Sequence, residues 1–201
     1  MPKALVVDYG VGNLFSIKHA LDKVGFSTTL GISKRQLKQA EAIILPGVGD
    51  FSTASENINP IKDCLIELAK GGVPVIGICL GMQLLFQKSE EGTGEGLALL
   101  EGENVQLPNS VKVPHMGWNT IRIVRQNWLF EGLENESYFY FAHSYVPVPT
   151  DKSLICAETF YGIPFASAVS KQNIYGVQFH PEKSGVQGLK FLENFLKFVK
   201  R

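Results

Sequence analysis

The first 90 residues alternate short apolar runs with amphipathic segments, and glycines separate the two. Runs typical of buried parallel strands occupy residues 4–7, 26–30, 42–45 and 73–78. Apolar residues at helical spacing occupy residues 14–24, 58–68 and 81–86. Asn13 is a suitable N-cap for the first of these helices, and Gly25 a suitable stop. This alternation predicts βαβ units with right-handed crossovers on a parallel sheet.

The pattern changes after Gly92. Short strand candidates separated by turn residues lie at 105–107, 120–124, 138–141, 154–159, 165–169 and 174–179, and a helix is predicted at 189–199. We interpret these strands as antiparallel hairpins added to the first half. The predicted fold is α/β, an open and mostly parallel sheet with flanking helices and added antiparallel strands in the C-terminal half. Residues 1–201 are expected to form one domain.

Composition excludes several classes of protein. Hydrophobic residues make up 45% of the 201 residues, which excludes intrinsic disorder. The 19 basic residues balance the 19 acidic ones and form no basic run, so nucleic acid is not an expected partner. A net charge of zero favours association with another chain. The sequence contains neither a membrane span nor a secretory signal, and its three widely spaced cysteines favour a reducing cytoplasm.

Cys79 lies where an apolar strand runs directly into a helix, between Gly77 and Gly81. This arrangement is the cysteine form of a nucleophile elbow, in which glycines relieve crowding around a strained residue. The positive end of the helix dipole favours the thiolate, which is the reactive form. Cys64 and Cys156, within a helical run and a strand, are instead expected to pack as small hydrophobic residues.

A thiolate nucleophile requires a base, and His180 is the strongest candidate. It follows the last predicted strand and precedes Pro181 and Glu182. In extended backbone, residues i and i+2 point to one side, so Glu182 is placed to orient the imidazole. We therefore predict a triad of Cys79, His180 and Glu182. His19 is expected to be a solvated or packing residue.

Two other chemistries fit the sequence poorly. His115 and His143 are rival bases and, with Cys79 or His180, nominal metal ligands, but their spacing fits no compact zinc pattern. Neither a metal nor another cofactor is therefore expected. The glycines at 10 and 12 suggest a dinucleotide fingerprint, but Phe15 occupies the place of its third glycine.

Five segments carry a resemblance to a known family. They are residues 10–13 (GVGN), 46–49 (PGVG), 79–86 (CLGMQLLF), 114–119 (PHMGWN) and 180–184 (HPEKS). The cysteine and His-Pro-Glu segments resemble those of the triad-type (class I) glutamine amidotransferases. The narrower PHMGWN and EKS segments resemble those of the glutaminase subunits of imidazole glycerol phosphate synthases. The resemblance runs from about residue 5 to the C-terminus.

The resemblance implies that Cys79 attacks L-glutamine to form a thioester, with release of ammonia and then glutamate. The oxyanion would be held by the amide of Leu80 and by the loop of Gly47, Val48 and Gly49, which could otherwise be an ordinary turn. That loop would rest with a carbonyl, and not an N–H, toward the oxyanion. The residues implied to hold the substrate's α-amino and α-carboxylate groups are Gln83, Glu91, Ser144 and Tyr145.

The resemblance also implies a partner, a cyclase subunit that forms imidazole glycerol phosphate and AICAR from PRFAR in histidine biosynthesis. The residues expected at its interface are Asn13, Trp118, Tyr140 and Lys183, although Trp118 and Tyr140 could instead pack in the core. Two alternatives stay open. One is the glutaminase subunit of another synthase, of the pyridoxal phosphate type or a sugar-modifying paralogue. The other is a non-catalytic binding module on the same fold.

Overall fold

The computed structural model describes residues 1–10 and 12–201; Val11, part of the Gly10–Asn13 segment of the resemblance, lies outside them. The main sheet of the described residues has the order β2 (Ser27–Gly31), β1 (Lys3–Val7), β3 (Ala42–Leu45), β4 (Val75–Ile78), β13 (Ile174–Val177), β12 (Ile163–Lys171), β11 (Ile155–Tyr161) and β8 (Arg122–Ile123). From β2 to β13 neighbouring strands are parallel, and from β13 to β8 they are antiparallel. The predicted α/β fold is confirmed.

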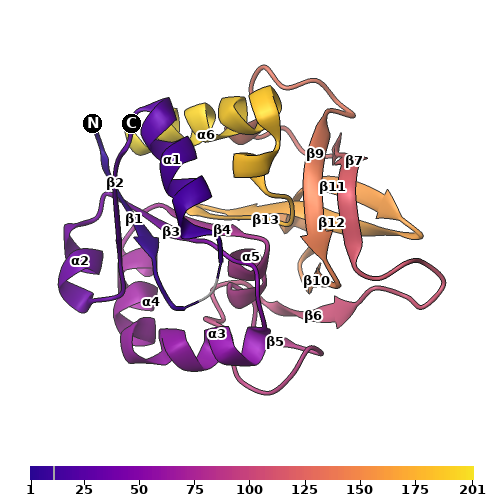
Figure 1. The fold of residues 1–201 in the computed structure, drawn as a ribbon, viewed down its shortest axis with the longest axis horizontal. Helices are drawn as coiled ribbons and strands as arrows, with labels where there is room; N and C mark the ends of the chain where they lie inside the picture. Colours follow the sequence, from indigo (N-terminus) through magenta and orange to yellow (C-terminus); the bar gives the residue numbers. More distant parts are fainter. Residues whose placement is uncertain (11) are drawn as a thin grey trace.

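Two smaller sheets accompany the main one (Figure 1). The first has the order β10 (Tyr145–Pro149), β6 (Gly102–Gln106) and β5 (Lys88–Ser89). The second pairs β7 (His115–Thr120) with β9 (Tyr138–His143) in antiparallel register. Both lie toward the end of the main sheet that carries its antiparallel strands.

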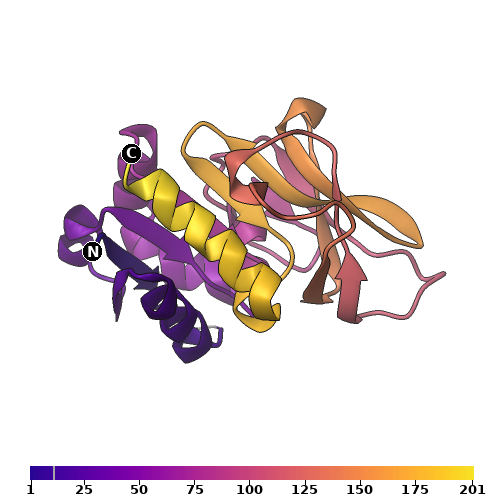
Figure 2. The same cartoon turned by 90° about the horizontal axis from the view of Figure 1, so that it is seen from above.

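Helices cover both faces of the parallel strands. The α-helices are α1 (Leu14–Val24), α2 (Lys34–Gln39), α3 (Phe51–Ile58), α4 (Lys62–Lys70), α5 (Leu80–Leu84) and α6 (Gly185–Val199). Short 3-10 helices are η1 (Asn59–Ile61), η2 (Trp128–Phe130), η3 (Lys152–Leu154) and η4 (Pro181–Lys183). Figures 1 and 2 show α1 and α6 together on one face, with α2, α3 and α4 on the other. Each face of the sheet buries its own apolar cluster.

Local sequence explains the first helix. The side chain of Asn13 accepts a hydrogen bond from the N–H of Ser16 at 3.2 Å, which satisfies a free donor at the start of α1. Gly25 ends the helix in a left-handed conformation at φ 111° that L-residues rarely adopt. Both predicted boundaries are confirmed.

One sequence prediction about elements was wrong, and a second was correct but incomplete. The single helix expected at 58–68 is instead the last residue of α3 followed by η1 and α4, because Pro60 lies in the 3-10 turn between the two α-helices. The strand expected at 174–179 as part of a hairpin is antiparallel to β12 but parallel to β4. That parallel pairing returns the end of the chain to the N-terminal half and, as described next, forms the site.

Candidate active site

Cys79 and His180 are brought together by neighbouring parallel strands. Cys79 directly follows β4, and two residues separate His180 from the end of β13. Ile78 is in register with Val177, and the N–H of Cys79 donates to the carbonyl of Val177 at 2.7 Å. The carboxyl ends of parallel strands meet at one edge of the sheet, where α/β folds place their ligand sites. Residues 101 positions apart thereby share one site.

The backbone of Cys79 is strained. Its φ of 53° and ψ of −108° lie outside the regions that L-residues favour. The strain is held in place by close packing, because a Cβ added to Gly81 would lie 1.9 Å from the carbonyl oxygen of Leu45. A Cβ added to Gly77 would lie 2.3 Å from the carbonyl oxygen of Gly81. The geometry is that of a nucleophile elbow: it presents the thiol at the start of α5.

Glu182 is hydrogen-bonded to His180, with 2.9 Å between Oε1 and Nδ1. Both side chains are almost fully buried. The intervening backbone is the start of η4 and not the extended backbone that the sequence reasoning assumed. Ser184 holds this turn, since its hydroxyl donates to the carbonyl of His180 at 2.6 Å and accepts from the N–H of Tyr140 at 3.0 Å.

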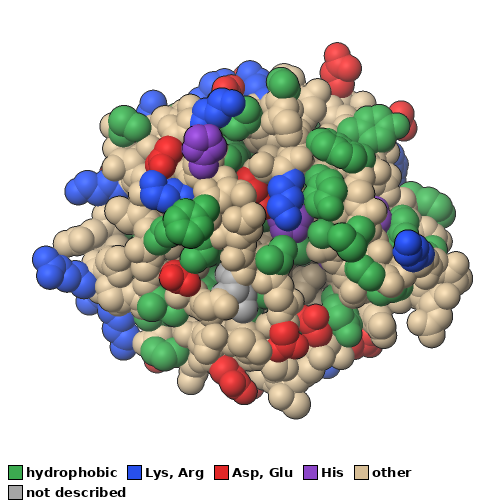
Figure 3. Space-filling model, viewed as in Figure 1, with side chains coloured by type: hydrophobic (Ala, Val, Ile, Leu, Met, Phe, Trp, Pro, Cys, Tyr) green, Lys and Arg blue, Asp and Glu red, His purple; other side chains and the backbone are tan. Residues whose placement is uncertain are grey.

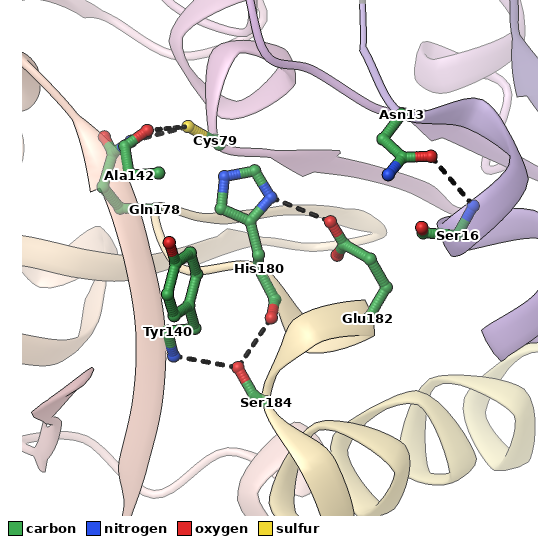
Figure 4. Close-up of polar contacts among 9 residues, drawn as sticks. All are labelled: Asn13, Ser16, Cys79, Tyr140, Ala142, Gln178, His180, Glu182 and Ser184. Atoms are coloured by element: carbon green, nitrogen blue, oxygen red, sulfur yellow. Dashed lines mark hydrogen bonds and ion pairs between the residues drawn. The ribbon is translucent and has the colours of Figure 1, made fainter. Parts of the chain in front are cut away.

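The imidazole of His180 lies between Cys79 and Glu182 (Figure 4). With Nδ1 bonded to the carboxylate, Nε2 is on the side of Cys79 and has no hydrogen-bond partner among the described residues. Burial lowers the pKa of His180, but the thiolate of Cys79 and the carboxylate of Glu182 outweigh it and raise that pKa to about 10. The arrangement therefore favours the charged form of the His180 imidazole.

Gln178 also contacts the nucleophile, and sequence reasoning missed it. Its fully buried side-chain amide donates to Cys79 Sγ at 3.4 Å and accepts from the side chain of Gln83 at 3.5 Å. The thiol itself is directed toward the carbonyl of Ala142 at 3.5 Å. The position of Gln178, two residues before His180, was the only sequence signal available.

A small cavity of about 70 Å³ opens beside the thiol. Its lining includes Val48, Gly49, Cys79, Leu80, Gln83, Glu91, Ala142, His143, Ser144 and Tyr145. The four residues predicted to hold substrate thus lie around the cysteine. Gln83 donates to the carbonyl of Tyr145 at 3.1 Å. One oxygen of Glu91 accepts from the N–H of Phe51 at 2.9 Å, and burial raises the pKa of this carboxyl group.

The loop that follows β3 lies against the elbow. A Cβ on Gly47 would come within 2.6 Å of the Leu80 side chain, so this position requires glycine. The carbonyl of the preceding Pro46 accepts a hydrogen bond from the buried hydroxyl of Tyr9. Gly49 has a φ of 145°, which glycine adopts without strain. The predicted oxyanion residues therefore lie next to Cys79, held on one side by Tyr9.

His115 and His143 are hydrogen-bonded elsewhere and not to the thiol, although His143 lines the cavity beside it. They are hydrogen-bonded to each other, with 3.0 Å between His115 Nδ1 and His143 Nε2. Burial lowers the pKa of His115 to about 4, and burial together with His115 lowers the pKa of His143 to about 3. Within the described residues, no group of three or more His, Cys, Asp or Glu side chains could hold a metal ion.

Two of the residues predicted at an interface, Trp118 of β7 and Tyr140 of β9, are directly opposite each other on one face of this strand pair. Lys183 lies in η4, and Asn13 is the N-cap of α1. Trp118 is 56% exposed, which rules out the core-packing alternative for it. Its ring is edge-on to that of Tyr140, with 6.1 Å between the ring centroids. Lys183 Nζ lies 5.7 Å from the centroid of the Tyr140 ring. Figure 3 shows hydrophobic side chains gathered on this face. Asn13 lines a narrow cleft with Gly47, His180 and Glu182, on the other side of the triad.

None of the described helices is long and apolar enough to cross a bilayer.

The elbow cysteine, the buried histidine–carboxylate pair and the α/β fold define a triad-type amidotransferase. The model of the family "Glutamine amidotransferase class-I" matches residues 5–198, and the chain belongs to that family. Among named relatives, it is 48% identical to "Imidazole glycerol phosphate synthase subunit HisH" of Pyrococcus furiosus over 97% of this chain and 98% of that one. The protein of the same name from Moorella thermoacetica is 45% identical over 97% and 94% of the two chains.

Solved structures agree on the fold. "Structure of PurLQS from Thermotoga maritima" has a TM-score of 0.78 at 23% identity, covering 98% of each chain. A second, "Crystal structure of glutamine amidotransferase", has a TM-score of 0.75 at 19% identity, covering 98% of this chain and 99% of the other.

Proposed function

We propose that this protein is a glutaminase that hydrolyses L-glutamine and supplies the ammonia to a cyclase, forming an imidazole glycerol phosphate synthase of histidine biosynthesis. Relatives named HisH at 45–48% identity over nearly the whole chain support the histidine pathway over another synthase. The single observation that carries the chemistry is the buried His180–Glu182 pair at the same sheet edge as the elbow Cys79.

The reaction begins with attack of the Cys79 thiolate on the side-chain carbonyl carbon of glutamine. A C–S bond forms, and the carbonyl electron pair moves to oxygen. The carbon–nitrogen bond then breaks as His180 donates its proton to the departing nitrogen, which leaves ammonia and a γ-glutamyl thioester. His180 next takes a proton from water, which attacks the thioester carbon; the C–S bond then breaks, which releases glutamate and restores the Cys79 thiolate beside a protonated His180. Glu182 keeps the imidazole in the productive tautomer and stabilises its charged form.

Glutamine lies in the cavity beside Cys79, with its amino-acid end toward Gln83, Glu91 and the Ser144–Tyr145 backbone. Glu91 supplies the negative charge that an α-ammonium group requires. Before substrate binds, the side-chain amide of Gln83 is engaged with the carbonyl of Tyr145. This assignment of the four residues is supported by their shared position around the thiol.

The oxyanion is held by the N–H of Leu80 and by an N–H from the Gly47–Gly49 loop. The glycines on both sides of Val48 allow peptides to rotate at low steric cost. In the resting protein, a carbonyl of this loop occupies the oxyanion position, and partner binding rotates the peptide. Loss of one such donor costs about 3–4 kcal/mol, or 10²–10³ in rate, which keeps the free glutaminase nearly idle.

The cyclase binds across the face that holds Asn13, Trp118, Tyr140 and Lys183. Exposed aromatic side chains beside a lysine are typical of interface anchors. This face adjoins Cys79 through β9, whose Ala142 carbonyl contacts the thiol. Ammonia therefore passes through the interface without reaching solvent.

Residues 1–201 act as one amidotransferase domain, which is supported by β13 and α6 lying among the N-terminal elements. The three cysteines are all unpaired, in keeping with an enzyme of the cytoplasm.

The test is glutaminase turnover for the isolated protein, with the cyclase, and with the cyclase plus PRFAR. We expect turnover to rise at each step, by about 10²–10³ or more overall. The Trp118→Ala variant should lose stimulation, whereas Phe160→Ala, which truncates another exposed aromatic on a different strand, should keep it. Equal rates under all three conditions would refute control by the partner. Equal use of free and glutamine-derived ammonia would refute channelling.

A further inference from the structure

A continuous chain of hydrogen bonds runs through the side chains of Asn119, His115 and His143. It ends at the cavity beside Cys79. Asn119 Nδ2 lies 3.3 Å from His115 Nε2, and His115 Nδ1 lies 3.0 Å from His143 Nε2. His143 Nδ1 then lies 3.0 Å from the carbonyl oxygen of Tyr145. Both imidazoles are almost fully buried. The reaction described above uses none of these three side chains.

Backbone groups fix the direction of the first bond. The side-chain oxygen of Asn119 accepts from the N–H of Thr120 at 2.8 Å, and its nitrogen donates to the carbonyl of Phe160 at 3.1 Å. The amide is therefore oriented with its nitrogen toward His115. The remaining N–H of that nitrogen is a donor, so His115 Nε2 must accept.

The other end of the chain is fixed in the same way. A carbonyl only accepts, so His143 Nδ1 carries the proton that is donated to Tyr145. A neutral His143 then has a bare Nε2, which accepts from a protonated Nδ1 of His115. Both histidines must be neutral and in the Nδ1–H tautomer for each bond to have one donor and one acceptor. Burial favours neutral imidazoles, which agrees with their lowered pKa values.

The chain ends on a backbone group that shapes the cavity. β9 ends at His143 and β10 begins at Tyr145, so the imidazole bridges the joint at Ser144. The carbonyl of Tyr145 also accepts from Gln83. Two donors from different elements therefore hold one peptide at the wall of the cavity where Ser144 and Tyr145 face Cys79.

We propose that Asn119, His115 and His143 are positioning residues, a directed chain of neutral side chains that holds the Ser144–Tyr145 backbone in the conformation that binds glutamine. The part that concerns glutamine rests on the proposed function, whereas the tautomers do not. His115 also stacks between Phe141 and Tyr161, at centroid distances of 4.9 and 4.0 Å. A histidine present only for packing would not require one particular tautomer.

The first test is ¹⁵N NMR of the ring nitrogens in histidine-labelled protein at neutral pH, with assignment by single histidine variants. We expect His115 and His143 to be neutral with the proton on Nδ1, the reverse of the Nε2–H form that free histidine prefers. The exposed His19 serves as the control, and the proton of its neutral ring is expected on Nε2. An Nε2–H or a doubly protonated ring at either position would overturn the proposal.

The second test is the Asn119→Asp variant, assayed in complex with the cyclase and PRFAR. A carboxylate cannot donate to His115, so the tautomer pattern should be lost, and KM for glutamine should rise by about tenfold. Since the chain does not touch the reacting atoms, kcat should change by less than about threefold, and alkylation of Cys79 by iodoacetamide should keep its rate.

Asn135→Asp is the matched control. The side-chain oxygen of Asn135 accepts a hydrogen bond from the N–H of Ile123, and a carboxylate can accept the same bond. An unchanged KM in Asn119→Asp would overturn the role in glutamine binding. If Asn119→Asp did not fold, the tautomers of His115 and His143 in the unsubstituted protein would still test the proposed chain. Failure of the proposed function gives a different result, the absence of glutamine hydrolysis from the unsubstituted complex.

Discussion

His180 Nδ1 lies 2.9 Å from Glu182 Oε1, although the two residues are joined by the start of a 3-10 helix and not by extended backbone. The turn shortens the path between the two side chains, and Ser184 and Tyr140 hold it closed. The pair is buried, so the carboxylate has few competitors for the imidazole. This contact defines which nitrogen of His180 faces Cys79.

The His180→Asn variant should lose glutaminase turnover by about 10²–10⁴-fold, the scale of lost acid–base catalysis. Glu182→Gln should lose less, because the imidazole survives without its orienting carboxylate. Steady-state assays of the complex with the cyclase measure both. His19→Asn, an exposed position, is the control and should keep full turnover. A larger loss from His143→Asn than from His180→Asn would show that the base is assigned to the wrong histidine.

The Gln178→Leu variant should slow alkylation of Cys79 by iodoacetamide at neutral pH. A hydrogen bond to a charged group contributes about 1.5–3 kcal/mol, so its loss predicts a decrease of about tenfold or more. Ser167→Ala is the matched control on the adjacent strand, where the buried hydroxyl has no hydrogen-bond partner among the described residues. Equal alkylation rates for the two variants would show that Gln178 does not support the thiolate.

The buried histidines predict a maximum of stability near pH 6.5. His115 and His143 have lowered pKa values in the folded state. Their contribution to the free energy of unfolding is therefore complete above about pH 6.5, and it is lost as the pH falls toward about 4 for His115 and about 3 for His143. The raised pKa of His180 has the opposite effect on stability. Its contribution to the free energy of unfolding is complete below about pH 6.5 and is lost as the pH rises through about 10.

Urea unfolding at about pH 5, 6.5 and 8.5 measures this effect. The free energy of unfolding should be largest at the middle value. The His115→Phe variant keeps the stacking between Phe141 and Tyr161 and should show a shallower loss on the acid side. Stability that increased from pH 6.5 to 5 would contradict the buried neutral pair.

The Gly81→Ala variant should be strongly destabilised, since its Cβ would lie 1.9 Å from the carbonyl oxygen of Leu45. Overpacking of this kind costs about 1–3 kcal/mol or more. Gly72→Ala is the comparison: its Cβ meets nothing within 4 Å, so only the strain of a φ of 97° remains, about 1 kcal/mol. Thermal unfolding should give the larger decrease in Tm for Gly81→Ala. The reverse order would mean that the elbow tolerates a side chain.

Sequence patterns predicted the parallel half of the fold well, because buried strands and capped helices leave local signals such as Asn13 and Gly25. They missed α2 and β7, which carry few buried residues and so lack a clear apolar period. They predicted the antiparallel pairing of β13 with β12 but missed its parallel pairing with β4. An apolar strand has the same pattern whether its neighbours are parallel or antiparallel, and the neighbour β4 is about a hundred residues away.

The candidate site divides in the same way. The sequence alone indicated Cys79, His180 and Glu182, because each stands in a short motif of neighbouring residues. Gln178 and Tyr9 act through contacts with sulfur and with Pro46 that only the folded chain creates. The link between His115 and His143 likewise depends on the register of β7 with β9, where the two residues are directly opposite.

The most direct test of the account is labelling of the native complex with a diazoketone analogue of glutamine, followed by peptide mapping. We expect one adduct, on Cys79, whose formation matches the loss of glutaminase activity and is slowed by glutamine. Cys64→Ala and Cys156→Ala should label normally, and Cys79→Ala should neither label nor hydrolyse glutamine. An adduct on Cys64 or Cys156, or full hydrolysis by Cys79→Ala, would contradict the account.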